Sequence, residues 1–229
     1  MNMTFFQTLY DKNKYVRAIA QKLGFSRPID LALESTRVVE YPWVLRNLPP
    51  EGKILDVGST GSQLPVMLAC LGYHVWTIDV RDYEYAGLRD NLHSVVGDIR
   101  RTSFPDRFFD VVIAVSTVEH VGLGRYGDPI DVEGDRNAIK EVKRVMTSDG
   151  ILLITVPFGK RFTTSLHRVY DEETLLLLLE GFDIQSIEYF LSTNRLWVRA
   201  SKEQVKEVDS SVKEGAIACV KAVNTQRVS

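Results

Sequence analysis

Three aspartates stand where three short apolar runs of the chain end: Asp56, Asp79 and Asp98. Asp56 is followed at once by a turn of small residues at 58–62. The carboxyl ends of parallel strands share one edge of a sheet, so we expect the three carboxylates to line one crevice. Carboxylates there accept hydrogen bonds from ribose hydroxyls, and a small-residue turn leading into a helix offers N–H groups to the same ligand. The pattern therefore predicts a nucleotide-type ligand site.

The glycine spacing of the turn narrows the choice of ligand. Asp79 follows Asp56 by 23 residues, close to the offset of about 20 at which an acid accepts the ribose hydroxyls. The turn reads Gly-Ser-Thr-Gly-Ser, which lacks the G-x-G-x-x-G spacing for a dinucleotide and the lysine of a P-loop. Because Thr60 is β-branched and disfavours a positive φ, we expect Gly61 to supply the flexible residue.

Alternating strand and helix patterns predict the scaffold that positions these residues. Strands alternating with helices indicate a parallel sheet with right-handed crossovers. After the last helix, two strand-like segments without an apolar helix between them favour an antiparallel pair at the sheet edge. Asp135 is the expected N-cap of one helix. The expected strands are residues 54–57, 75–79, 94–97, 111–115, 151–156, 184–191 and 215–223, and the expected helices are 62–71, 135–146 and 172–180.

The segment before the first strand is expected to be helical. Apolar residues recur at helical spacing over residues 4–23, and a second helical region covers about 30–48, interrupted or restarted at Pro42. The sequence Pro-Pro-Glu-Gly at 49–52 breaks the pattern. We therefore expect an N-terminal helical lid or extension over residues 1–50 and one ligand-binding domain over 51–229. The alternative is that the first helix packs as ordinary core or against another subunit.

Composition sets the broad class. The chain has 229 residues, 45% of them hydrophobic, with a net charge of −2 and a pI near 6.1. These values are ordinary for a globular domain and give no basic footprint for nucleic acid. The apolar runs are too short to span a membrane, and no signal-peptide core is present at the N-terminus. We expect a cytoplasmic protein without a membrane span; the oligomeric state stays open.

Several motifs, taken together and in order, resemble a known family. They are Lys-Ile-Leu-Asp-Val-Gly-Ser-Thr-Gly-Ser at 53–62, Thr-Ile-Asp-Val at 77–80, Gly-Asp-Ile at 97–99, Phe-Asp-Val-Val-Ile-Ala-Val-Ser-Thr-Val-Glu-His at 109–120, Glu-Val-Lys-Arg-Val-Met at 141–146 and Gly-Ile-Leu-Leu-Ile-Thr-Val-Pro at 150–157. Over about residues 50–190 the chain resembles class I S-adenosylmethionine-dependent methyltransferases, most closely the small-molecule branch that includes ubiquinone/menaquinone-type enzymes. The resemblance implies an α/β fold with a Rossmann-like doubly wound sheet, mostly parallel with an antiparallel last strand, plus N-terminal helices.

The resemblance also implies roles for residues along the strand ends. The turn after the first strand would lie near the methionine part of S-adenosylmethionine, the second strand would end at its ribose, and the third at its adenine. The implied cofactor-binding residues are Asp56, Gly58, Ser59 and Gly61 near the methionine part, Asp79 on the ribose hydroxyls, Val80 packing on the adenine, Asp98 and Ile99 at the adenine edge, and Ser116 under the sulfonium.

The methyl acceptor is expected between two loops beyond the fourth and fifth strands. Methyl transfer from a sulfonium is an in-line displacement, so the protein mainly aligns the acceptor and excludes water. In the glycine-rich loop 119–128, His120 is the candidate general base, although it could instead bind backbone and shape the loop. A run of acids at 128–135 reads as turn and cap residues rather than a metal site. The candidate substrate-binding residues are Arg125 and Tyr126 in the first loop and Arg161, His167 and Tyr170 in the second, whose alternative is a solvated basic loop.

These observations predict a methyltransferase that acts on a small molecule, more readily at oxygen than at another atom. The loop Gly-Leu-Gly-Arg-Tyr-Gly-Asp at 122–128 is similar to loops of methyltransferase-like proteins associated with cell-surface glycans, which favours a sugar or glycolipid precursor. A nucleic-acid substrate is disfavoured, because Val-Ser-Thr-Val occupies 115–118 in place of an Asn/Asp-Pro-Pro-Tyr motif. Two alternatives stay open: an NAD(P)-dependent oxidoreductase, and a non-catalytic module that binds S-adenosylmethionine to regulate a partner.

Overall fold

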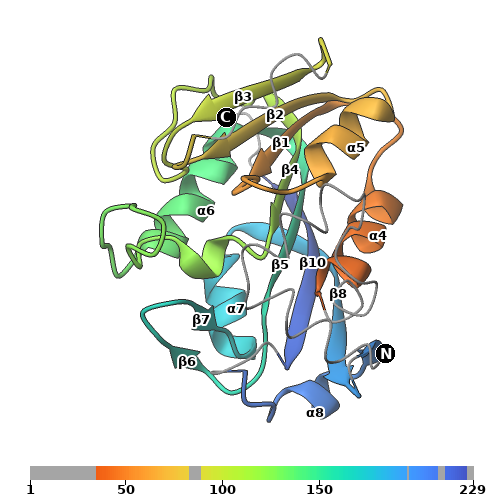
Figure 1. Cartoon of the computed structure of the whole chain (residues 1–229), viewed down its shortest axis with the longest axis vertical. Coiled ribbons are helices and arrows are strands. Elements are labelled where there is room, and N and C mark those ends of the chain that lie inside the picture. The colour runs from red at the N-terminus through yellow and green to blue at the C-terminus, as the bar shows by residue number, and fades with distance from the viewer. Residues whose placement is uncertain (1–34, 83–88, 195, 211–214, 226–229) are drawn as a thin grey trace, which may run out of the picture.

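The chain folds around one twisted sheet of eight strands (Figure 1). This computed structural model describes residues 35–82, 89–194, 196–210 and 215–225. The strand order is β3-β2-β1-β4-β5-β10-β8-β9, and a separate two-stranded hairpin pairs β6 with β7. The strands are β1 (Lys53–Val57), β2 (His74–Asp79), β3 (Leu92–Val96), β4 (Phe109–Val115), β5 (Met146–Pro157), β6 (Phe162–Thr163), β7 (Arg168–Val169), β8 (Phe182–Thr193), β9 (Leu196–Ala200) and β10 (Ala216–Asn224).

The first five strands of the large sheet are parallel, as the sequence predicts. β1 pairs with β2 on one side and with β4 on the other, and β2–β3 and β4–β5 continue outward. Strands β2 and β3 therefore lie on one side of β1, and the chain then crosses to place β4 and β5 on the other side. In such sheets a ligand binds beyond the strand ends where the order reverses, which here is between β1 and β4.

The tail of the chain adds the antiparallel part of the sheet. The two predicted strands pair with each other as β8 and β10, but β10 lies inside the sheet, antiparallel to both β5 and β8. The predicted edge position is wrong, because a further strand, β9, pairs antiparallel with the outer side of β8. β9 is short and largely exposed, so it lacks the continuous apolar run that marks a buried strand.

Helices cover both faces of the sheet (Figure 1). The helices are α4 (Arg37–Asn47), α5 (Leu64–Cys70), α6 (Gly134–Val145), α7 (Glu172–Leu178) and α8 (Lys202–Val205), with a 3-10 turn η1 at Val118–His120. Alternate residues of each buried strand face opposite sides: Ile54 joins Trp43 of α4 in one core cluster, whereas Leu55 joins Ile139 of α6 in the other. Among the described residues, no helix combines the length and apolar character needed to cross a bilayer.

Two local expectations about helices are corrected by the structure. Helix α6 begins at Gly134 with Glu133 at the cap position, and no side chain caps it. Asp135 is therefore not the N-cap; its carboxylate accepts the Tyr170 hydroxyl instead. Helix α4 runs through Pro42 without interruption. The helix expected at 4–23 lies outside the described residues.

Candidate active site

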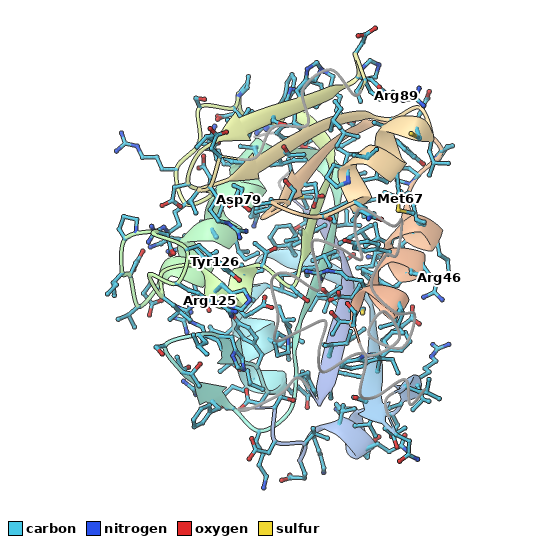
Figure 2. All side chains as sticks on the ribbon, in the orientation of Figure 1. Arg46, Met67, Asp79, Arg89, Arg125 and Tyr126 are labelled. Atoms are coloured by element: carbon cyan, nitrogen blue, oxygen red, sulfur yellow. The ribbon has the colours of Figure 1, made fainter. Side chains whose placement is uncertain are left out.

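A cavity of about 200 Å³ opens at the carboxyl ends of β1, β2 and β4. We call it the strand-end cavity. Figure 2 shows Asp79 and Tyr126, which both line it, on the same side of the molecule. Most of the predicted cofactor-binding residues come together here, with two of the residues predicted for the acceptor side. Its lining includes Gly58, Asp79, Val80, Asp98, Ile99, Ser116, His120 and Tyr126, and also Arg37, Thr60, Arg81, Thr117 and Asp128.

The turn after β1 lines part of the cavity through Gly58 and Thr60. Gly58 and Gly61 have φ of 72° and 78°, whereas Thr60 does not have a positive φ, which confirms that Gly61 takes the flexible position. A Cβ atom at Gly58 would lie 2.3 Å from Cγ2 of Thr117, so this position has no room for a side chain. Ser59 is buried, and neither it nor Gly61 lines the cavity.

The carboxylates of Asp79 and Asp98 are both held by arginines two residues further along the chain. Burial alone would raise the pKa of Asp79, but hydrogen bonds from Arg81 and Thr60 outweigh it and lower that pKa below its ordinary value. The Arg100 guanidinium likewise lowers the pKa of Asp98. Both groups are therefore ionised acceptors at neutral pH.

Asp56 lies beneath the turn rather than in the cavity lining. Its side chain is buried, and its Oδ2 atom has no hydrogen-bond partner within the described part of the chain. Burial raises the pKa of Asp56 from 3.8 to about 7, with Arg37 acting against the shift and Asp79 adding to it. A nearby positive charge would favour the ionised form of this buried carboxyl.

A fully buried glutamate of α4 connects that helix to the floor of the cavity. Glu40 accepts hydrogen bonds from Ser116 Oγ at 2.6 Å and Thr155 Oγ1 at 2.5 Å, while Arg37 donates to its other oxygen at 2.5 Å. Ser116 has a φ of 45°, a strained conformation that is typical of functional sites. The sequence reading missed Arg37 and Glu40. The available signal was that Glu40 shares the buried helix face of Trp43.

His120 lies at the edge of the cavity with its ring orientation fixed. Its Nδ1 is 2.6 Å from the carbonyl oxygen of Leu166, and because a carbonyl only accepts, Nδ1 carries the proton. The Nε2 lone pair is then free to accept a proton, and Nε2 lies 3.7 Å from Oε1 of the buried Glu119. Burial lowers the pKa of His120 to about 4, so the imidazole is neutral at pH 7. The alternative role given for His120, binding backbone to shape its loop, is met by this contact at Nδ1. The contact does not involve Nε2.

Arg125 and Tyr126 take different positions beside this histidine. The Tyr126 ring meets the His120 ring edge-on at 5.6 Å and lines the cavity. Arg125 does not line the cavity; its guanidinium donates to the Leu166 carbonyl at 3.2 Å. Figure 2 shows Arg125 and Tyr126 close to each other on the same face as Asp79.

The second predicted segment, residues 158–170, contributes less to this cavity than expected. Of its predicted substrate-binding residues, only His167 is near His120, with the two rings 6.4 Å apart. Arg161 and Tyr170 instead line a separate cavity of about 320 Å³ under the β6–β7 hairpin. Tyr170 is buried and donates to Asp135 at 2.8 Å, since its side chain faces α6. The structure therefore does not bring Arg161 and Tyr170 together with Asp79.

Two acids of the loop 128–135, Asp128 and Asp131, accept local main-chain hydrogen bonds. Asp128 accepts the main-chain N–H of Gly122 at 2.6 Å, and Asp131 accepts that of Glu133 at 3.0 Å, which confirms the expected turn roles. Arg168 donates to the carbonyl of Val121 at 2.7 Å and so holds the loop that carries His120.

Comparisons with known proteins agree with the fold. Over 114 residues the chain is 31% identical to sterol 24-C-methyltransferase ERG6B from Gibberella zeae, a match over 45% of this chain and 27% of that protein. The chain thus spans about a quarter of the length of this curated relative. An S-adenosylmethionine-dependent methyltransferase structure from Methanosarcina mazei has a TM-score of 0.60 at 19% identity, covering 82% of this chain and 99% of that one. The cyclase SpnF has a TM-score of 0.59 at 19% identity, covering 80% and 79%.

These likenesses show that the chain has the fold of class I S-adenosylmethionine-dependent methyltransferases, which confirms the predicted fold class. A family model described as "Caenorhabditis protein of unknown function, DUF268" matches residues 57–217, more than half of the chain. The matched span runs from the end of β1 to the start of β10 and includes the strand-end cavity residues after β1. The chain belongs to the DUF268 family.

Proposed function

We propose that this protein is an S-adenosylmethionine-dependent methyltransferase that acts on a small-molecule acceptor. The observation that carries the proposal is that Asp79 and Asp98 line the same cavity as the Gly58 turn, at the point where the strand order reverses. Two ionised acceptors beside a main-chain turn suit the ribose and adenine of a nucleoside. The curated relative with 31% identity is a methyltransferase, which supports the same reading.

The chemistry of the lining residues fits this cofactor. When bound, S-adenosylmethionine would supply an activated methyl group on a sulfonium. Asp79 would accept the ribose hydroxyls and Asp98 the adenine amine, while Val80 and Ile99 would pack on the base. Gly58, Ser59, Gly61 and Ser116 would lie toward the methionine part. The buried Asp56 carboxyl would be stabilised by the positive charges at that end.

We further propose that the acceptor is methylated at oxygen and that His120 is the general base. A hydroxyl acceptor must lose a proton, and the neutral ring of His120, which lines the cavity, can accept it at Nε2 because Nδ1 is held by the Leu166 carbonyl. Glu119, whose Oε1 lies 3.7 Å from Nε2, would pair with the imidazolium that then forms and act against the burial that disfavours it. A sugar or glycolipid precursor is the proposed substrate class, with Tyr126 and Arg125 beside the base. Membership of the ubiquinone/menaquinone-type branch, a cytoplasmic location and the division at residue 50 stay predictions.

A calorimetric titration tests the cofactor assignment. We expect micromolar binding of S-adenosylhomocysteine and no binding of NAD, because the turn lacks the glycine spacing for a pyrophosphate. Binding of NAD without S-adenosylhomocysteine would overturn the proposal and favour the oxidoreductase.

A second candidate is a protein that binds the cofactor without transferring its methyl group. The observation that favours it is that SpnF, a cyclase, shares this fold at a similar TM-score. Sugar nucleotides, glycolipid precursors and other hydroxylated acceptors, incubated with methyl-labelled S-adenosylmethionine, separate the two. Label in an acceptor supports the methyltransferase, and binding without transfer to any acceptor supports the second candidate.

A further inference from the structure

The Asp79 carboxylate holds four hydrogen bonds, arranged in two pairs. Oδ1 accepts from the main-chain N–H of Arg81 at 3.0 Å and from its Nε at 3.1 Å. Oδ2 accepts from the main-chain N–H of Thr60 and from Nη2 of Arg81, both at 3.1 Å. Each oxygen therefore has one main-chain donor and one guanidinium donor. Since an ionised carboxylate offers about four lone-pair sites, all of them are in use.

The guanidinium donors are the exchangeable pair. The main-chain donors are fixed by the turn after β1 and by the end of β2, whereas the Arg81 side chain is 38% exposed. The Arg81 guanidinium also lies over the Tyr126 ring, with its Cζ 4.3 Å from the ring centroid. This cation–π contact gives the Arg81 guanidinium a second partner besides Asp79. Arg81 can therefore leave the carboxylate and keep a favourable partner.

The equivalent arginine at Asp98 is anchored differently. Arg100 donates to Asp98, but it also donates to the carbonyl of Pro129 at 2.8 Å and lies 3.5 Å from Asp131. Its side chain is only 11% exposed. Arg100 thus ties the 122–134 loop to the sheet, and displacement would break several contacts. The contrast identifies Arg81 as the replaceable donor of the two.

We propose that Arg81 competes with the vicinal diol of a ribose for Asp79 and so sets affinity and selectivity for diol-bearing ligands. This inference rests on the proposed function in one respect, that Asp79 is the ribose acceptor. Two neighbouring hydroxyls would replace two guanidinium N–H groups, one on each oxygen, and leave both main-chain bonds in place. The displaced Arg81 stays on Tyr126, whose ring meets His120. Cofactor binding is thereby linked to the acceptor side of the cavity.

The test is calorimetric titration of the full chain with S-adenosylhomocysteine. Arg81→Met keeps an apolar stem against Tyr126 and removes the competing donors. We expect it to bind about two- to fivefold more tightly than the wild type, the scale of one partly exposed ion pair. Arg46→Ala is the matched control: Arg46 pairs with Glu188 at 2.5 Å and lies far from Asp79 in Figure 2. Its affinity should equal that of the wild type.

A second ligand pair isolates the diol. Adenosine and its dideoxy analogue, which lacks both ribose hydroxyls, are compared by competition against S-adenosylhomocysteine. The gain in Arg81→Met should appear for adenosine and be absent for the analogue. An equal gain in affinity for both ligands would show a general change in the electrostatic potential of the cavity and would overturn the inference.

The outcomes separate this inference from the proposed function. Wild-type binding with equal or weaker binding by Arg81→Met overturns the Arg81 inference and leaves the proposed function standing. No binding by the wild type or any variant overturns both. Thermal unfolding establishes that each variant is folded. Arg81→Lys, which keeps the charge but loses the two-point contact, decides the question if Arg81→Met does not fold: tighter binding supports the inference, and unchanged or weaker binding overturns it.

Discussion

Asp56→Asn is expected to make the protein's stability less dependent on pH above about pH 4. The wild-type carboxyl is buried, Oδ2 has no partner in the described residues, and its pKa rises from 3.8 to about 7 on folding. The folded state therefore holds a proton that the unfolded state has already lost. The stability contribution is fully present below the unfolded pKa and is lost as pH rises through the folded pKa. Asparagine has the same shape and cannot ionise.

The size of the effect follows from the two pKa values. Raising the pKa of Asp56 from 3.8 to about 7 corresponds to about 4 kcal/mol of stability in total, of which about 2.5 kcal/mol is lost between pH 5 and pH 8. His120 changes stability with pH in the opposite direction. Burial lowers its pKa to about 4, so its contribution to folding stability is lost as pH drops below its ordinary pKa of 6.5. That contribution is common to wild type and mutant, so it cancels when the two are compared at each pH.

Urea unfolding followed by tryptophan fluorescence measures this difference, because Trp43 is buried in the core. Between pH 5 and pH 8 the wild type should lose about 2.5 kcal/mol more stability than Asp56→Asn. Asp149→Asn is a matched control at an exposed position whose φ of 64° asparagine tolerates, and it should follow the wild type. A stability difference between wild type and Asp56→Asn that stays constant with pH, or grows in the other direction, would refute the burial argument.

Three further substitutions test the site. Asp79→Ala should weaken S-adenosylhomocysteine binding by about 1–3 kcal/mol in a calorimetric titration, because the ribose acceptor is lost; unchanged affinity would contradict the assignment. His120→Ala should keep that affinity and lower turnover by about 10²–10⁴-fold in a methyl-transfer assay, and full activity would exclude the base role. Glu40→Ala should cost about 1–3 kcal/mol in urea unfolding, because the hydroxyls of Ser116 and Thr155 and the partly exposed Arg37 lose their acceptor; a loss below about 1 kcal/mol would show that the contact is not structural.

The shared position of Asp79 and Asp98 was predictable because it depends on topology alone. Alternating strand and helix patterns imply a parallel sheet, and a parallel sheet places its strand ends at one edge. It was also predictable that Gly61, and not Thr60, adopts the positive φ in the turn after β1, because φ preferences are a local property of each residue type.

Contacts between distant elements were not predictable in the same way. Tyr170 belongs to a segment rich in basic residues, and nothing local shows that its hydroxyl meets Asp135 across 35 residues of chain. Glu40 reaches Thr155 across 115 residues. The Arg81 contact with Asp79 spans only two residues, but its proposed role depends on the Tyr126 ring, 45 residues further on, also meeting the guanidinium. Such pairings depend on tertiary packing, which periodicity does not encode.

The measurement that tests the central claim most directly is a structure determined with S-adenosylhomocysteine. The account predicts the ligand in the strand-end cavity, with its ribose hydroxyls on Asp79, its adenine amine at Asp98 and its methionine part beside Gly58. The Arg81 guanidinium should then lie off Asp79 and over Tyr126. A ligand bound under the β6–β7 hairpin, or one in the strand-end cavity without contact to either carboxylate, would contradict the account.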